Sequence, residues 1–344
     1  MTQMMREIGE QPEALARTLD ALLPLRPEIA ALAAGRRHVL FVARGSSDNA
    51  AIYGRYLSEV FAGRQAALAA PSVATHYAAD LELSDTVTVC VSQSGETAEI
   101  AETQAWAAGH GARTIAITNV DGSTLARAAD LALVTRAGAE LAVPATKTYT
   151  TQLAAIAVLV SALAEEPDAL DFSRVPAAAS LVLERARPTA ETAAGLLAGT
   201  ADTLVTGRGI TYGTALEVAL KLEETCLRPV RGLSYADLKH GPIAVVDADL
   251  ATVLVAAPQG PTVAGMTQLA TTLRERHAAV VGIGGDAAFA ANCDIALPGP
   301  DLPEALAPLA LAIPGQLMVE ALARHLGLDP DSPRGLSKVT QTDH

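Results

Sequence analysis

Short runs of apolar, mostly β-branched residues recur along the chain and alternate with longer segments rich in Ala and Leu. Each run is apolar at nearly every position rather than at alternate positions, which is typical of strands buried on both faces of a sheet. The segments between the runs are long enough to be helical crossovers between parallel strands. The pattern therefore predicts an α/β fold in which parallel sheets carry helices on both faces, as in three-layer flavodoxin-like domains. The predicted strands are residues 39–43, 86–91, 113–118 and 131–134, followed by 203–206, 251–256, 279–283 and 295–297.

The chain also repeats itself. The sequence at 39–45, Val-Leu-Phe-Val-Ala-Arg-Gly, is echoed at 203–209 by Thr-Leu-Val-Thr-Gly-Arg-Gly. Further matches follow in the same order at nearly the same offset, which is the signature of an internal duplication. We therefore predict two copies of one domain, at residues 30–180 and 190–330, after a helical segment at 1–29 and before a C-terminal tail at 331–344.

One predicted strand runs directly into a hydroxyl-rich turn that opens a helix, with the sequence Ser92-Gln93-Ser94-Gly95-Glu96-Thr97. The hydroxyls of Ser92, Ser94 and Thr97 can donate hydrogen bonds, and Gly95 lets the backbone approach a ligand closely. The helix N-terminus adds unpaired N–H groups and a partial positive charge. Ser and Thr also cap helices routinely, so the turn alone permits either a phosphate site or a simple cap.

The position of the turn favours the phosphate site, because parallel sheets bind ligands beyond the carboxyl ends of their strands. Arg44-Gly45-Ser46-Ser47 follows another strand of the same copy. The corresponding turn of the second copy reads Ala257-Pro258-Gln259-Gly260 and has no hydroxyl. We therefore predict one phosphate site per chain, in the first copy.

The second copy carries a different set of candidates. Glu217, Lys221 and Glu224 fall on one face of a helix predicted to begin near Thr211, and His240 precedes a Gly-Pro turn. Each has an ordinary interpretation, because Glu/Lys stripes are usually solvated and a lone His is usually structural. Together, a carboxylate, a lysine and a histidine are suited to aldose–ketose chemistry, which needs a base to move a proton between adjacent carbons and an acid/base to open the sugar ring.

Composition and charge narrow the function classes. The chain has 344 residues, 50% of them hydrophobic, and a net charge of −13, which argues against nucleic-acid and anionic-membrane partners. The longest apolar run, Leu153 to Ala164, is shorter than the roughly 20 residues that a membrane span needs, so we expect a buried helix. The N-terminus shows no signal peptide, which favours a cytoplasmic location. Three distant cysteines without metal-ligand spacing indicate small structural residues in a reducing compartment.

The chain resembles the sugar isomerase (SIS) domain family over nearly its whole length. The resemblance is to the isomerase half of glucosamine-6-phosphate synthases and to the SIS-type glucosamine-6-phosphate deaminases. The matching segments occur in the family's order: 7–12 (Glu-Ile-Gly-Glu-Gln-Pro), 92–97, 117–120 (Ile-Thr-Asn-Val), 145–147 (Ala-Thr-Lys), 215–222, 238–242 (Leu-Lys-His-Gly-Pro) and 333–338 (Pro-Arg-Gly-Leu-Ser-Lys).

The resemblance implies a role for each candidate residue. Glu224 would be the base that moves a proton between C1 and C2, and His240 the ring-opening group, contributed to the active site of the partner subunit in a homodimer. Lys338 would form an imine with the open-chain sugar, with Glu217 and Lys221 supporting the site. The phosphate would be bound by Ser47, Ser92, Gln93, Ser94 and Thr97, and the sugar by Val143 and Ser46. The resemblance implies neither a metal nor an organic cofactor.

The chain also departs from the synthase pattern. Only the predicted helical segment at 1–29 precedes the first predicted SIS copy, and it contains no Cys. We therefore expect that this chain alone cannot hydrolyse glutamine. Pro144-Ala145 stands where the synthase carries a serine that touches the sugar, Val218 replaces a usual Gly, and Asp237 a usual Glu. Free ammonia is present at low concentration, so mass action favours the direction that releases it. We therefore expect conversion of glucosamine 6-phosphate to fructose 6-phosphate and ammonia. The alternatives are a fructosamine-6-phosphate deglycase, an ammonia-dependent synthase and, less favoured, a sugar-phosphate-sensing regulator.

Overall fold

The computed structural model describes residues 1–338 and forms two compact units. The first-sheet unit comprises residues 13–140 and 147–172 together with Ser337 and Lys338. The second-sheet unit comprises residues 1–12, 141–146 and 173–336. Each unit is built around one five-stranded sheet in which every strand pair is parallel.

The two sheets have the same strand order. The first runs β2-β1-β3-β4-β5, and the second runs β10-β9-β8-β6-β7, which is the same order read from the other edge. Both are therefore flavodoxin-like, and the predicted α/β class and duplication are confirmed. The strands are β1 (His38–Val42), β2 (Gln65–Leu68), β3 (Thr86–Val91), β4 (Arg113–Thr118) and β5 (Leu131–Val134), then β6 (Asp202–Gly207), β7 (Val230–Ser234), β8 (Leu250–Ala256), β9 (Ala279–Gly284) and β10 (Ile295–Leu297).

Helices cover both faces of the first sheet. On one face, Ile100 and Leu125 of α6 and α7 pack with Val42 and Cys90 of the strands. On the other face, Phe41 lies against Gly54 of α4, where α4 also packs on α8. Phe41 and Val42 thus point to opposite faces, as successive strand residues do. The helices are α3 (Arg26–Leu32), α4 (Ser46–Val60), α5 (Ser72–Thr75), α6 (Ala98–Gly109), α7 (Thr124–Ala128) and α8 (Lys147–Leu163).

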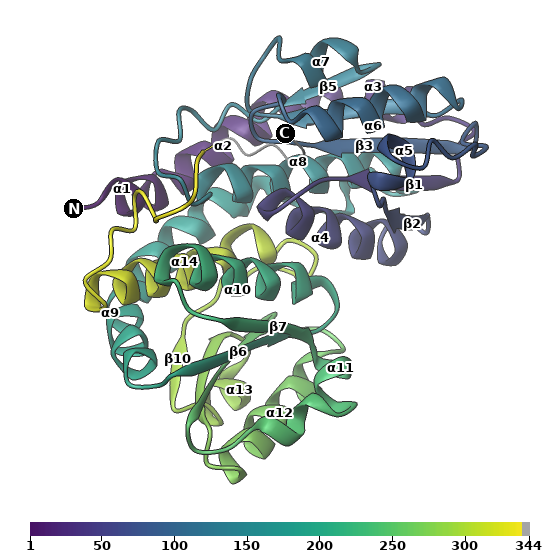
Figure 1. Ribbon diagram of the computed structural model, residues 1–344. Helices are drawn as coiled ribbons and strands as arrows, with labels where there is room; N and C mark the ends of the chain where they lie inside the picture. The colour runs from purple at the N-terminus through teal and green to yellow at the C-terminus, as the bar shows by residue number, and fades with distance from the viewer. Residues whose placement is uncertain (339–344) are drawn as a thin grey trace. The chain divides into compact units, whose positions relative to one another are not determined.

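The second sheet is covered in the same way (Figure 1). Tyr235 and Leu238 of α11 pack with Met266 and Leu269 of α12 on one face. On the other face, α10 packs on α14, and α14 packs on α9. The helices are α1 (Gln3–Gly9), α9 (Val175–Ala198), α10 (Tyr212–Cys226), α11 (Tyr235–Lys239), α12 (Val263–Glu275), α13 (Ala287–Ala291) and α14 (Pro308–His325); α2 (Gln11–Leu22) begins in this unit and continues into the other.

The duplication extends to individual hydrogen bonds. Asp130, just before β5, accepts a hydrogen bond from the backbone N–H of Thr114 on β4 at 2.8 Å. Asp294, just before β10, accepts one from the backbone N–H of Val280 on β9, also at 2.8 Å. In each unit an aspartate therefore joins the last two strands of the sheet.

The predicted buried helix is confirmed, because every residue of α8 from Lys147 to Leu163 is buried. Over residues 1–338, none of the helices combines the length and apolarity needed to cross a membrane. The three cysteines, Cys90, Cys226 and Cys293, are all free thiols.

Candidate active site

The hydroxyl-rich turn lies where the order of the first sheet reverses. The strands β1 and β3 are neighbours, and the chain leaves β1 through α4 toward β2 but leaves β3 through α6 toward β4. The N-termini of α4 and α6 therefore follow the carboxyl ends of adjacent strands. This is the switch point at which doubly wound sheets bind ligands, and two helix N-termini there favour an anion.

Within the turn, backbone N–H groups orient the hydroxyls. The Ser92 Oγ accepts a hydrogen bond from the Gly95 N–H at 3.2 Å, and the Ser94 Oγ accepts one from the Glu96 N–H at 3.2 Å. The Thr97 Oγ1 lies 3.4 Å from the Ser92 Oγ and belongs to the N-cap residue of α6. A hydroxyl that accepts from the backbone keeps its own hydrogen for donation, so the turn presents O–H donors to a ligand.

Gly95 is required for a reason other than the predicted approach to a ligand. Its φ is +67°, and a Cβ at this position would lie 2.2 Å from the Ser123 Oγ. Ser123 is itself the N-cap of α7. The glycine therefore lets the turn pack closely against the beginning of α7.

The second predicted contribution to the phosphate site lies at the start of α4. Ser47 is buried, and its Oγ accepts a hydrogen bond from the Gln152 Nε2 on α8 at 3.0 Å. Ser46 is half-buried in the first turn of α4. Arg44, directly after β1, pairs with Glu99 in the first turn of α6 through two hydrogen bonds of 2.7 and 3.0 Å. This ion pair joins the two turns.

The equivalent turn of the second sheet is unsuited to an anion. A Cβ at Gly260 would lie 2.3 Å from a carboxylate oxygen of Glu304, so this side chain packs directly against the turn. Burial raises the pKa of Glu304, against a hydrogen bond from Thr262 that lowers it. The turn that carries no hydroxyl thus has a carboxyl group packed against it, and the single phosphate site per chain stays a prediction.

The three charged candidates lie along α10, from Glu217 near its middle to Lys221 and Glu224 in its last turns. Lys221 and Glu217 are each 1% exposed, so the interpretation as a solvated salt-bridge stripe is wrong. The Lys221 Nζ forms an ion pair with Glu224 and lies 3.5 Å from the Glu217 Oε1. Glu224 keeps 25% of its side chain exposed, so it is the member of the cluster that a ligand can reach.

A third carboxylate, Glu223, lies next to Glu224 on α10. Burial and the negative charge of Glu224 raise the pKa of the adjacent Glu223, while a hydrogen bond from the Val230 backbone lowers it. Burying Lys221 and Glu217 costs solvation free energy, which their mutual attraction and the ion pair with Glu224 offset.

His240 lies apart from this cluster in the chain's own sheet. It is exposed and forms the C-cap of α11, where its backbone N–H donates to the Asp237 carbonyl at 3.1 Å. Because α11 packs with α12 and α10 packs with α14, the two helices cover opposite faces of the second sheet. His240 and Glu224 therefore come from opposite faces of that sheet.

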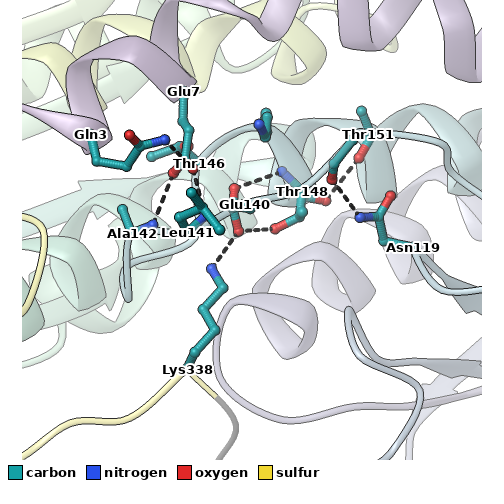
Figure 2. Close-up of polar contacts among 12 residues, drawn as sticks. Gln3, Glu7, Asn119, Glu140, Leu141, Ala142, Thr146, Thr148, Thr151 and Lys338 are labelled. Atoms are coloured by element: carbon teal, nitrogen blue, oxygen red, sulfur yellow. Dashed lines mark hydrogen bonds and ion pairs between the residues drawn. The ribbon is translucent and has the colours of Figure 1, made fainter.

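Lys338 is docked in the first-sheet unit. Its Nζ lies 2.7 Å from the Glu140 Oε2, and the same buried carboxylate accepts hydrogen bonds from the backbone N–H and the Oγ1 of Thr148 at 3.1 and 2.6 Å (Figure 2). Glu140 thus holds the first turn of α8 and the predicted imine lysine at once. No motif in the sequence marks Glu140 as a site residue.

Val143 lies on a loop at residues 141–146, which belongs to the second-sheet unit. Val143 is half-buried, and its N–H donates to the Asp331 carbonyl at 2.9 Å. The structure therefore places Ser46, Ser47, Ser92, Gln93, Ser94, Thr97 and Lys338 in the first-sheet unit, and Val143, Glu217, Lys221, Glu224 and His240 in the second-sheet unit.

Comparison with known proteins identifies the duplicated domain. The SIS domain model matches residues 33–162 and again 197–325. The chain is 34% identical over 348 residues to a glutamine–fructose-6-phosphate aminotransferase (isomerizing) from Thermococcus kodakarensis, with 97% of this chain and 57% of the relative covered. It therefore spans little more than half the length of this relative.

Solved structures show the same fold. The C-terminal domain of a glucosamine-fructose-6-phosphate aminotransferase from Francisella tularensis superposes with a TM-score of 0.88 at 28% identity, covering 97% of this chain and 98% of the other. A glucosamine-6-phosphate deaminase from Thermotoga maritima superposes with a TM-score of 0.80 at 23% identity, covering 99% and 100%.

Proposed function

Because this chain belongs to the SIS domain family, with two tandem SIS domains, we propose that it is an aldose–ketose isomerase of amino sugar phosphates that interconverts glucosamine 6-phosphate and fructose 6-phosphate. The observation that carries the proposal is the buried Glu217–Lys221–Glu224 cluster, in which one carboxylate stays accessible. The phosphate turn at the switch point of the first sheet supports it. The name of the Thermococcus kodakarensis relative includes fructose 6-phosphate and isomerisation, and the name of the Francisella tularensis protein joins glucosamine with fructose 6-phosphate.

In the proposed reaction, His240 opens the sugar ring and Glu224 removes the proton from C2 of the open-chain aldose. Glu224 then returns the proton at C1, which converts the amino aldose to a 2-imino ketose. Addition of water to the imine releases ammonia and leaves fructose 6-phosphate. In this release, the Lys338 amine would first replace the amino group of the substrate in the imine at C2, which releases ammonia, and water would then hydrolyse this lysine imine. Lys221 holds the Glu224 carboxylate in place by its ion pair.

We propose a homodimer in which His240 serves the active site of the partner subunit. Its support is that Glu224 and His240 come from opposite faces of one sheet, and that His240 is exposed. A two-fold interface would bring the two groups together twice, once at each active site.

The reaction is tested by measuring ammonia release across a panel of hexosamine and fructosamine 6-phosphates. Release from glucosamine 6-phosphate with formation of fructose 6-phosphate is the expected result. Release from fructosamine 6-phosphates alone would indicate the deglycase. Turnover of none of them, in either direction and with glutamine or ammonia supplied, would refute the proposal.

The base is tested by substituting Glu224 with Gln, which keeps its shape but cannot accept the proton. The variant should lose exchange of the C2 proton with solvent deuterium while inorganic phosphate still binds. Glu223→Gln is the matched control, because this neighbour is exposed on the same helical turn, and it should exchange normally. Normal exchange in Glu224→Gln would assign the base to another group, with Glu217 the first to test.

A further inference from the structure

The N-terminal segment Glu7-Ile8-Gly9-Glu10-Gln11-Pro12 takes no part in the proposed chemistry, yet two of its polar side chains are fully buried. Glu7 and Gln11 are both 0% exposed. The Glu7 carboxylate accepts hydrogen bonds from the backbone N–H groups of Leu141 and Ala142, at 2.5 and 3.2 Å, and from the Gln3 Nε2 at 2.9 Å (Figure 2). A buried carboxylate is therefore directed at the backbone of the loop 141–146.

The same segment also holds the far end of this loop. The Gln11 Nε2 donates to the Gln316 Oε1 on α14 at 2.7 Å, and the Gln316 Nε2 donates to the Thr146 carbonyl at 3.3 Å. All of these groups are buried. Glu7 thus fixes the beginning of the loop, and Gln11 fixes its end through one intermediary.

The middle of the loop is held by Asp331, which is also tied to α1. The Asp331 carbonyl accepts from the Val143 N–H at 2.9 Å, and its carboxylate accepts from the N–H groups of Gln3 and Met4 at 2.8 and 2.7 Å. Three consecutive N–H groups, from residues 141 to 143, therefore have acceptors that belong to one network around α1, in which Glu7 is fully buried and Asp331 half-buried.

We propose that Glu7 and Gln11 are positioning residues, which fix the backbone of the loop 141–146 so that it meets the sugar. The inference rests on the proposed function, in which Val143 contacts the sugar. A charged acceptor makes stronger hydrogen bonds than a neutral one, so a buried carboxylate can hold the loop in one geometry before substrate arrives. Small displacements of groups that position substrate are costly to turnover.

The test substitutes Glu7 with Gln and measures three quantities. The KM for the sugar phosphate should rise about tenfold, because the loop loses one acceptor and its geometry. The inhibition constant of inorganic phosphate should stay within about twofold of wild type, because phosphate alone uses the turn at 92–97. Hydrogen exchange of a peptide that covers residues 138–148 should become faster.

Asp294→Asn is the matched control, since this carboxylate also holds a backbone N–H at 2.8 Å in the same unit but far along the chain from the loop. It should lower the melting temperature without changing the KM. If Glu7→Gln fails to fold, Gln316→Met offers a milder change, because it removes only the bridge to Thr146.

Unchanged KM and unchanged exchange in both loop variants would overturn the inference. A KM and a phosphate inhibition constant that rise together would also overturn it, because that result indicates a general loss of structure. The exchange measurement does not depend on catalysis. An inactive wild-type protein would therefore refute the proposed function while the exchange result still decides whether Glu7 holds the loop.

Discussion

At the scale of single residues, each serine of the proposed phosphate turn at 92–97 can accept a hydrogen bond from the backbone and donate one to a ligand. Ser94 accepts a hydrogen bond from the Glu96 N–H and keeps its own hydrogen for a ligand. A hydrogen bond to a charged group contributes about 1.5–3 kcal/mol, so Ser94→Ala should raise the KM of the sugar phosphate about ten- to a hundredfold, with a smaller effect on kcat.

Steady-state kinetics with the sugar phosphate check this prediction. Ser180→Ala, at an exposed position of α9, is the control and should behave as wild type. A loss of kcat at unchanged KM in Ser94→Ala would contradict a role in holding phosphate.

The sequence singles out candidate residues for the chemistry, but it does not predict their surroundings. The spacing of Glu217, Lys221 and Glu224 predicts one helical face, and α10 confirms it. The same spacing occurs on solvated and on buried helices, so the burial of Lys221 depended on packing against other elements and could not be predicted. The contact between Glu140 and Lys338 joins residues far apart in the chain, and no local pattern marks such a pair.

At the scale of elements, the eight predicted strands are present, and two edge strands were missed. β2 and β7 are the edge strands beside β1 and β6. Their residues are partly exposed, with the burial patterns of half-covered strands, whereas β3 and β8 are buried throughout. An edge strand pairs on one side only, so its sequence need not be continuously apolar. β2 contains Gln65 and β7 contains Arg231, which interrupt the apolar run, whereas the opposite edge strands β5 and β10 are apolar throughout and were predicted.

Helix packing accommodates Val218, one of the departures from the synthase pattern. Gly315 on α14 faces Val218 on α10, and a Cβ on Gly315 would lie 2.5 Å from the Val218 Cγ2. The glycine on α14 therefore allows α10 and α14 to approach closely at Val218.

The link between β4 and β5 gives a pH-dependent prediction. Burial alone would raise the pKa of Asp130, but hydrogen bonds from Thr114 and Arg113, with the charge of Arg113, outweigh it and lower the pKa. A carboxyl whose pKa is lowered in the folded protein stabilises the fold at pH values above its ordinary pKa of about 3.9. This contribution is lost as the pH falls from that value through the lowered pKa.

Asp130→Asn should therefore reduce the free energy of unfolding at pH 7 by less than about 1 kcal/mol, since Arg113 and Asp130 are both partly exposed. The difference from wild type should narrow as the pH falls below about 4. Melting temperatures measured across this range, with the exposed Asp121→Asn as control, check the prediction. A difference that stays constant with pH would indicate a packing effect instead.

At the scale of the whole molecule, one fold occurs twice, with different side chains at equivalent positions of the two copies. The first copy keeps hydroxyls at its switch point, and the second copy has Glu304 packed against the equivalent turn. The second copy supplies the Glu217–Lys221–Glu224 cluster instead. Under the proposed function, the first copy would bind the phosphate at its switch point and the second copy would supply the acid–base groups.

The shared active site is tested by mixing two inactive variants. If Glu224 of one subunit works with His240 of its partner, Glu224→Gln and His240→Ala should each be nearly inactive alone. In a mixed dimer, one site receives both lesions and the other receives none. Random exchange of equal amounts makes half of the dimers mixed, so about one quarter of wild-type activity should return under two-fold symmetry.

The mixture must first be shown to have exchanged subunits, for example by native mass spectrometry of differently tagged variants. A mixture of Glu224→Gln with Glu217→Gln is the control, because both lesions lie on α10 and every site then keeps one of them. If activity stays flat in the first mixture after verified exchange, both groups act within one subunit. His240 would then have to reach its own sheet's opposite face around the edge strand β7, because α10 and α11 cover different faces.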